Sequence, residues 1–293
     1  MRVRLVDVEY FSKTLLDKAA KFALVGRLPN PAVSEALGLL ETLELFVRTL
    51  TILVLTIPES RGKLFRDDVK SVCTDLIKGI ASLINPSLEE PLDTQMHPEH
   101  LFANHNAIFD VCERMKNLSY NNSMAIQKRW DDSMELLQDV INEMEELQND
   151  DGMFDFDDSA FEKEGSPLTD DDKAMVKRCL AIVKLTKILF KKLLVRCIKD
   201  CQPNTEEKVS WLDQLYETSK KVLEKVDDLG VSLHETCNIQ IICLHAAELT
   251  DVCAKIIDVA KLLTSEEHLS WFEKCGDQYH RVLVSILERS PQR

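Results

Sequence analysis

Apolar residues recur along this chain at separations of three and four positions, the period of a helix with one buried face. The pattern predicts helices at about residues 7–26, 32–56, 64–83, 99–117 and 122–147 in the first half. After residue 168 it predicts helices at about 169–200, 204–233, 236–263 and 265–287. Thr169 is an N-cap candidate followed by three acids, and Asn204 with Glu207 and Thr264 with Glu267 have capping-box spacing. Prolines fall between these segments rather than inside them, as expected where a helix must end.

Three segments give the strongest helical pattern. The stretch 32–56 is the most apolar and predicts a buried central helix, with Leu39, Leu43, Phe46, Leu50, Leu53 and Val54 facing the core. The stretch 122–147 carries Ile126, Trp130, Met134, Leu137, Ile141 and Met144 at alternating separations of four and three. A heptad seam with one polar break runs through Leu212, Leu215, Ser219, Val222, Val226, Leu229 and Leu233.

These elements predict an all-α fold of two antiparallel helical bundles joined by an acidic flexible linker. The first five helices would form an N-terminal bundle over residues 1–147. The linker would cover residues 148–168, and the C-terminal bundle residues 169–293.

Composition agrees with a helical globular protein and limits the class further. The 293 residues include only 8 glycines and 9 prolines, with 45% apolar and 29% charged residues, too few turn formers for a sheet protein. The longest uncharged apolar stretch, residues 49–57, is far shorter than the roughly 20 residues of a membrane-spanning helix. Charge close to Met1 argues against a secretory signal. The 9 scattered cysteines predict reduced thiols and an intracellular protein.

Charge is distributed unevenly along the chain, whose formal net charge is −14. Residues 145–172 contain twelve acids and one lysine, whereas residues 173–199 contain nine bases and no acid. Five lysines of the basic segment share one arc of the predicted helix and form a basic stripe: Lys173, Lys177, Lys184, Lys187 and Lys191.

The basic stripe has several interpretations. We favour a solvated helix face whose counter-charge is the chain's own acidic linker. The alternatives are an acidic protein partner, anionic lipid or RNA bound through residues 173–199. The negative net charge and the lack of aromatic residues along the stripe do not favour nucleic acid.

The sequence contains no convincing catalytic or metal motif. A calcium loop with Gly152 at its sixth position would begin at Leu147 and lack its first ligand. The histidines His97, His100 and His105 lie close in sequence but lack zinc-site spacing, and we interpret them as surface residues. No phosphate-binding loop or nucleophile elbow is present. We therefore expect no catalytic residue, metal, cofactor or small-molecule substrate, and no enzyme activity.

The linker is the more promising region for a partner. Its aromatic residues Phe154, Phe156 and Phe161 are set among acids that include Asp157 and Asp158. Such a segment can stay solvated until a partner with a basic, apolar groove orders it, or it can be a plain connector; the residues leave both open. Candidate partner-binding residues are these five together with Lys177, Lys184, Lys187 and Lys191. Candidate phosphorylation sites are Ser159, Ser166 and Ser290.

Several segments, in the same order from about residue 40 to 287, resemble the cyclin-D-binding protein family, also called Maid. They are Thr49-Leu50-Thr51-Ile52 followed by Pro58, Asn142-Glu143-Met144-Glu145-Glu146, Cys179-Leu180-Ala181-Ile182-Val183-Lys184 with Lys187, and Val226-Asp227-Asp228-Leu229. The linker is shorter than in that family, and Ser219 weakens the seam, which argues against zipper-like dimerisation.

The resemblance implies a non-enzymatic regulator of cytoplasm and nucleus that binds D-type cyclins. It would thereby limit phosphorylation of the retinoblastoma protein by the cyclin-dependent kinase and slow cell-cycle progression. The family has also been described as dominant-negative partners of helix-loop-helix proteins. Exposing buried bundle faces to such a partner would cost on the order of 25 cal/mol per Å² of apolar surface, so we favour a partner that binds the linker or an outer surface.

Overall fold

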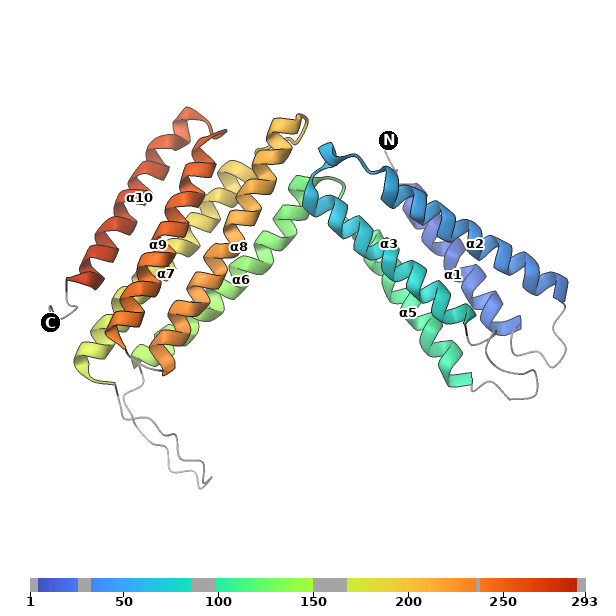
Figure 1. Ribbon diagram of the computed structural model, residues 1–293, viewed down its shortest axis with the longest axis horizontal. Helices are drawn as coiled ribbons and strands as arrows, with labels where there is room; N and C mark the ends of the chain where they lie inside the picture. The colour runs from blue at the N-terminus through green and yellow to red at the C-terminus, as the bar shows by residue number, and fades with distance from the viewer. Residues whose placement is uncertain (1–4, 26–32, 86–97, 150–167, 236–237, 289–293) are drawn as a thin grey trace, which may run out of the picture. The chain divides into compact units, whose positions relative to one another are not determined.

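The computed structural model describes residues 5–25, 33–85, 98–149, 168–235 and 238–288, without the side chains of residues 5–9, 98–105 and 234–235. Every regular element in these ranges is helical, which confirms the all-α prediction (Figure 1). Within the same ranges, no helix is both long enough and apolar enough to cross a membrane. Contacts divide the chain into two compact units, residues 1–125 and 126–293.

The described part of the first unit is a ring of four helices. They are α1 (Leu5–Val25), α2 (Val33–Thr56), α3 (Lys63–Ile84) and α5 (Pro98–Lys116). Both α1 and α3 contact α2 on one side and α5 on the other, so the ring is closed. A short 3-10 helix, η1 (Glu59–Arg61), precedes α3. The core contains buried residues from all four helices, among them Leu15, Leu43, Leu76, Ile80, Ile108 and Cys112.

The helix α2 differs from its predicted role as a buried central helix. Leu39, Leu43 and Leu50 are buried as expected. However, α2 is one wall of the ring, and its outer side is exposed to solvent at Leu45, Ile52 and neighbouring residues. The apolar composition of α2 therefore exceeds what the core of its own unit requires.

A polar turn before α6 (Asn122–Asn149) holds α3 in place. Asn121 caps α6, since its Oδ1 accepts a hydrogen bond from Met124 N at 2.9 Å. Asn122 is fully buried, and its Oδ1 accepts a hydrogen bond from Phe65 N at 3.2 Å. That amide is one of those that the first turn of α3 leaves without an intrahelical partner. The asparagines of this turn thus serve as caps for two helices.

The second unit contains α7 (Asp170–Leu193), α8 (Glu206–Glu235), α9 (Ile239–Lys261) and α10 (Glu266–Leu287). Along the chain α8 contacts α9 and α9 contacts α10, and α10 packs back on α7. The whole predicted heptad seam of α8 is buried, including its polar break, where Ser219 Oγ donates to Tyr216 O at 2.6 Å. A buried polar contact joins α10 to α7, because Tyr279 Oη donates to Thr186 Oγ1 at 2.9 Å.

The packing of α6 differs from the predicted domain boundary. We expected this helix to close the bundle of residues 1–147, but from Ile126 onward it belongs to the second unit. Trp130 is fully buried, its Nε1 donates to Phe190 O at 3.0 Å, and its ring lies 4.8 Å from that of Phe190 in α7. The apolar face of α6 was recognised correctly, but periodicity identifies a buried face without identifying the helix that covers it. The predicted linker, residues 148–168, lies almost wholly outside the described residues.

Candidate functional site

The helix α7, which carries the basic stripe, begins at a well-formed cap. Thr169 and Asp172 form a capping box, in which Asp172 N donates to Thr169 Oγ1 at 3.2 Å and Thr169 N donates to Asp172 Oδ2 at 3.1 Å. Three aspartates in the first turn complement the positive end of the helix dipole. This start is the one that the sequence predicted. The helix then continues past Leu193 into a π-helical turn, η2 (Leu194–Ile198).

The apolar side of α7 is buried within the second unit, as predicted. Burial is complete or nearly so at every core position that the periodicity selected, namely Met175, Val176, Cys179, Ile182, Val183, Leu189, Phe190, Leu193 and Cys197. Because these residues form the core, they are not available to a helix-loop-helix partner without unfolding the unit. The opposite side of α7 is therefore the side on which a partner can bind.

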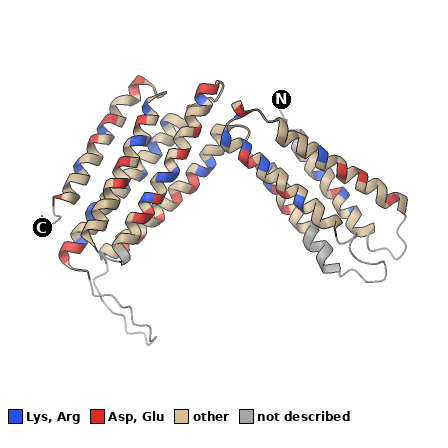
Figure 2. Ribbon diagram, in the orientation of Figure 1, with Lys and Arg blue, Asp and Glu red and all other residues tan. Residues whose placement is uncertain are grey.

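The basic stripe on that side has a centre that is paired with α6, flanked by two exposed lysines. At the centre, Lys184 Nζ lies 2.6 Å from Glu145 Oε1, and Lys187 Nζ donates to Gln138 Oε1. Both partners belong to α6, and Glu145 is the first acid of the acidic run identified in the sequence. Lys177 and Lys191 are exposed on either side of this contact. Figure 2 shows the alternation of basic and acidic residues over these helices.

This arrangement bears on the ligands considered from sequence. A stripe that tracks a nucleic-acid backbone or a lipid surface needs consecutive uncompensated cations. Here two of the four candidate lysines, Lys184 and Lys187, already contact acceptor groups of α6. The Lys184–Glu145 ion pair is exposed, and such a pair contributes at most about 1 kcal/mol to stability. The geometry favours a short contact with an acidic protein surface at Lys177 or Lys191 over an extended polyanion.

The remaining candidate residues lie outside the described residues. These are the partner-binding candidates Phe154, Phe156, Asp157, Asp158 and Phe161, and the phosphorylation candidates Ser159, Ser166 and Ser290. The same holds for His97 and for the side chains of His100 and His105.

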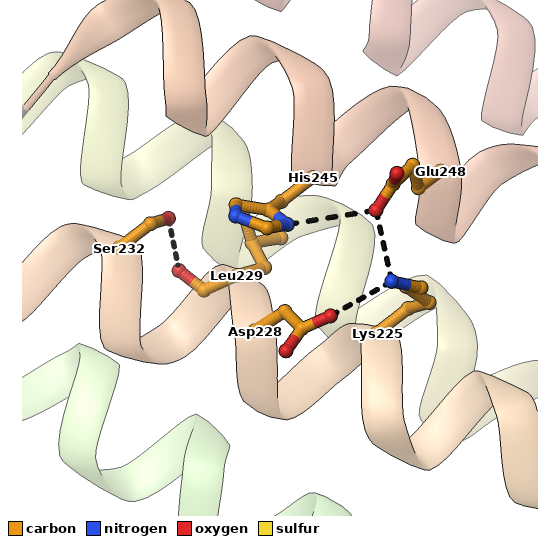
Figure 3. Close-up of polar contacts among 6 residues, drawn as sticks. All are labelled: Lys225, Asp228, Leu229, Ser232, His245 and Glu248. Carbon is orange, nitrogen blue, oxygen red and sulfur yellow. Dashed lines mark hydrogen bonds and ion pairs between the residues drawn. The ribbon is translucent and has the colours of Figure 1, made fainter.

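A second charged cluster, which sequence reasoning missed, links α8 to α9 (Figure 3). Lys225 Nζ lies 2.8 Å from Asp228 Oδ2 and 2.9 Å from Glu248 Oε2. Hydrogen bonds to Asp228 and to Glu248 raise the pKa of the Lys225 ammonium well above its usual range. His245 Nδ1 lies 3.6 Å from the same Glu248 oxygen. The members come from two helices, so only the pairing of α8 with α9 could have brought them together in a prediction.

The cluster contains a set of groups that could hold a metal ion. One ligand atom each from Asp228, His245 and Glu248 lies within 4.8 Å of the others. However, the ammonium of Lys225 lies between the two carboxylates and already makes the contacts that a cation would make. A divalent ion would have to displace it against charge repulsion. The residues therefore fit an internal ion-pair cluster better than a metal centre.

The cysteine thiols among the described residues are poorly suited to nucleophilic catalysis. Eight cysteines there are free, and seven of these are buried. Burial raises the pKa of Cys73 to about 11 and that of Cys179 to about 12. A thiol with such a pKa is almost wholly protonated at neutral pH and is a poor nucleophile. Two small cavities, of about 220 and 260 Å³, lie at the start of α7 and beside η2. Cys197, Cys201 and His268 line the second cavity, where burial raises the pKa of both thiols.

Comparison with known proteins identifies the family to which the chain is similar. Two models of the Grap2 and cyclin-D-interacting family match the chain, the N-terminal model over residues 7–150 and the C-terminal model over residues 148–258. They meet at the end of α6, whereas the packing units meet near its start.

Individual relatives cover most of the chain as well. Cyclin-D1-binding protein 1 of Rattus norvegicus is 21% identical over 286 residues, 92% of this chain and 78% of the relative. The Cyclin-D1-binding protein 1 homolog of Danio rerio is 22% identical and covers 89% of this chain and 78% of its own length. The Homo sapiens protein is 22% identical and covers 84% and 72%. With both family models matched in order, this chain belongs to the Grap2 and cyclin-D-interacting family.

Proposed function

We propose that this chain is a non-enzymatic regulator that binds a D-type cyclin or a related regulatory protein. The observation that carries the proposal is the match to relatives named as cyclin-D1-binding proteins over about nine tenths of the chain. Binding would limit phosphorylation of the retinoblastoma protein by the cyclin-dependent kinase, in cytoplasm and nucleus, and so slow cell-cycle progression.

The proposal assigns the contact to the two exposed lysines that flank the centre of the basic stripe and to the acidic, aromatic segment 148–168. Lys177 and Lys191 are exposed and flank the centre that is paired with α6. An acidic surface on the partner would meet these two lysines without displacing any part of the bundle. The helix-loop-helix alternative receives no such support, because the apolar faces of α7, α8 and α9 are buried.

The first test is a titration of the purified full chain against a D-type cyclin, alone and with its kinase, at physiological salt. Saturable binding and reduced phosphorylation of the retinoblastoma protein are expected. Binding without any change in phosphorylation would retain the partner and refute the inhibition. Absence of binding to both the cyclin and its kinase complex would refute the proposal.

The second test locates the contact. Replacing Lys177 and Lys191 by glutamate should weaken the complex roughly tenfold, mainly through slower association, because two exposed contacts change sign. The matched control, Lys70→Glu with Lys78→Glu, changes net charge equally on exposed positions of α3 and should leave affinity unchanged. Deleting residues 152–165 should weaken binding as well while leaving both units folded. Equal effects of the α7 and α3 variants would exclude a specific role for the stripe.

A further inference from the structure

Among the described residues, α2 exposes more large apolar side chains than any other helix. Val33, Leu37, Leu45, Ile52 and Leu55 are each 54 to 78% exposed. The inner side of the helix contacts α1 and α3, and no other described helix of its unit packs on the outer face. Figure 2 shows that the second half of α2, beyond Arg48, carries no charge. Contiguous exposed apolar residues of this kind mark an interaction surface.

The threonines of α2 make the face more apolar than its sequence suggests. Thr49 Oγ1 donates to Leu45 O, Thr51 Oγ1 to Val47 O and Thr56 Oγ1 to Ile52 O, each at 2.8 Å. These hydroxyls satisfy their hydrogen bonds on the helix itself. A surface that covers them therefore leaves no hydroxyl donor unpaired, and burial of the face is less costly than the residue types imply.

The face has the spacing of a helix-pairing seam. Gly38, Glu41, Leu45, Arg48, Ile52 and Leu55 follow one another at separations of three, four, three, four and three residues. This is the repeat with which one helix packs along another. Gly38 is exposed, and a Cβ added there would meet no atom within 4 Å. A glycine in a helix interior costs about 1 kcal/mol relative to alanine, and no described residue of the unit requires a glycine at this position. A second helix that approaches closely at this point would.

We propose that α2 pairs with α2 of a second copy of the chain in antiparallel orientation. If the two helices are related by a twofold axis between Phe46 and Val47, Leu55 of the second copy lies over Gly38. In the same register Ile52 of the second copy lies opposite Glu41, and its Arg48 lies opposite Leu45. The small glycine receives a large side chain, and the arginine stem covers a leucine.

The charged residues on this face favour a second copy of α2, rather than an unrelated apolar helix, as its binding partner. In this register Arg48 of the second copy lies beside Glu41 and Glu44, and by symmetry the reverse contact also forms. Within one chain, Arg48 Nη2 lies 2.7 Å from Glu44 Oε1, an exposed pair that could be shared across the axis. The same patch is thus complementary to itself, as a twofold interface requires. One helix face of 24 residues, about 36 Å long, is a small interface, so the dimer is weak and forms at micromolar concentration.

The first test is sedimentation velocity of the full chain from 1 to 200 μM. The weight-average mass should rise toward twice the monomer mass. Ile52→Glu with Leu55→Glu should raise the dissociation constant at least a hundredfold, because two apolar contacts are lost and both carboxylates are buried close to Glu41 of the second copy, a like charge. Both residues are exposed, so the helical circular dichroism should not change. The matched control, Leu136→Glu with Leu244→Glu, alters residues of similar exposure on α6 and α9 and should leave association unchanged.

The second test concerns the register. A chain with both Gly38→Cys and Leu55→Cys should form an interchain disulfide under mild oxidation, whereas a chain with either substitution alone should not. The described native cysteines give a low background, because burial raises the pKa of each. A parent chain that stays monomeric over the whole concentration range would overturn the proposal. So would cross-linking by the single variants alone, or loss of association in the α6–α9 control. A monomer whose α2 variant loses cyclin binding would instead assign this face to the cyclin.

Discussion

At the start of α3, the side chain of the distant Asn122 fills the space that a side chain at position 62 would need, next to Gly62. Gly62 has φ of 93°, a conformation in which a side chain is strained. A Cβ at Gly62 would lie 2.5 Å from Cβ of Asn122, the residue that receives the hydrogen bond from Phe65 N. The cap of α3 therefore depends on the absence of a side chain at Gly62.

This contact predicts opposite effects for two glycine substitutions. Gly62→Ala should lower the free energy of unfolding of the first unit by about 2–4 kcal/mol, through positive φ and overpacking. Gly276→Ala, in the open interior of α10, should raise that of the second unit by about 0.5–1 kcal/mol. Hydrogen exchange of the most protected amides in α3 and α10 measures both. A neutral Gly62→Ala would contradict the capping role of Asn122.

The N-cap residue of a helix could be predicted from sequence only where one residue alone fits the N-cap pattern. Thr169 was identifiable as an N-cap candidate, and in the structure it caps α7 as part of a capping box. Capping-box spacing at Asn204 and at Thr264 was wrong by one residue, because α8 begins after Thr205, whose Oγ1 accepts from Lys208 N at 3.3 Å, and α10 begins after Ser265. Where two adjacent residues both favour the N-cap position, only the backbone geometry decides which of them caps the helix.

At the scale of elements, the sequence predicted each α-helix that lies in the described ranges, but not the neighbours of every α-helix. Periodicity determines that one face of α6 or α2 is apolar. It does not determine that Trp130 packs on Phe190 in α7, or that five of the fourteen apolar residues of α2 are exposed to solvent. These outcomes depend on which helices compete for a limited core.

The placement of α6 gives a prediction for the full chain. Trp130→Ala should destabilise the second unit by about 3–5 kcal/mol, because it removes a buried ring and its hydrogen bond to Phe190 O. Amides of α7 should then exchange faster while those of α3 keep their protection. Leu76→Ala, in the core of the first unit, should do the reverse. If Trp130→Ala instead speeds hydrogen exchange of the α3 amides, α6 belongs to the first bundle, as the sequence predicted.

At the scale of the whole molecule, the candidate site was partly predictable. The sequence identified the basic stripe, since its lysines share one helix, but not that α6 would pair with Lys184 and Lys187. The Lys225 cluster could not be predicted from the sequence, because its residues come from two helices and meet only when α8 packs on α9. Contacts within a helix follow from the spacing of residues, whereas contacts between helices require the packing.

Buried thiols throughout both units predict how stability depends on alkaline pH. An unfolded thiol loses its proton near pH 8.5. In the folded chain, burial raises the pKa of Cys73, Cys112 and Cys253 to about 11 and that of Cys179, Cys197 and Cys275 to about 12. Above pH 8.5 the folded state therefore binds more protons than the unfolded state, so the free energy of unfolding falls as pH rises.

Each such thiol contributes a slope of at most about 1.4 kcal/mol per pH unit between its unfolded and folded pKa values. Lys225, whose pKa is also raised, acts in the same direction at higher pH. We expect urea midpoints that are nearly constant from pH 7 to 8 and fall steeply from pH 9 to 10. Replacing Cys73 and Cys112 by alanine should flatten the slope for the first unit alone, although it lowers stability at every pH. A slope no steeper at pH 9–10 than at pH 7–8 would show that the thiols ionise in the folded chain, and hence that its two cores admit water.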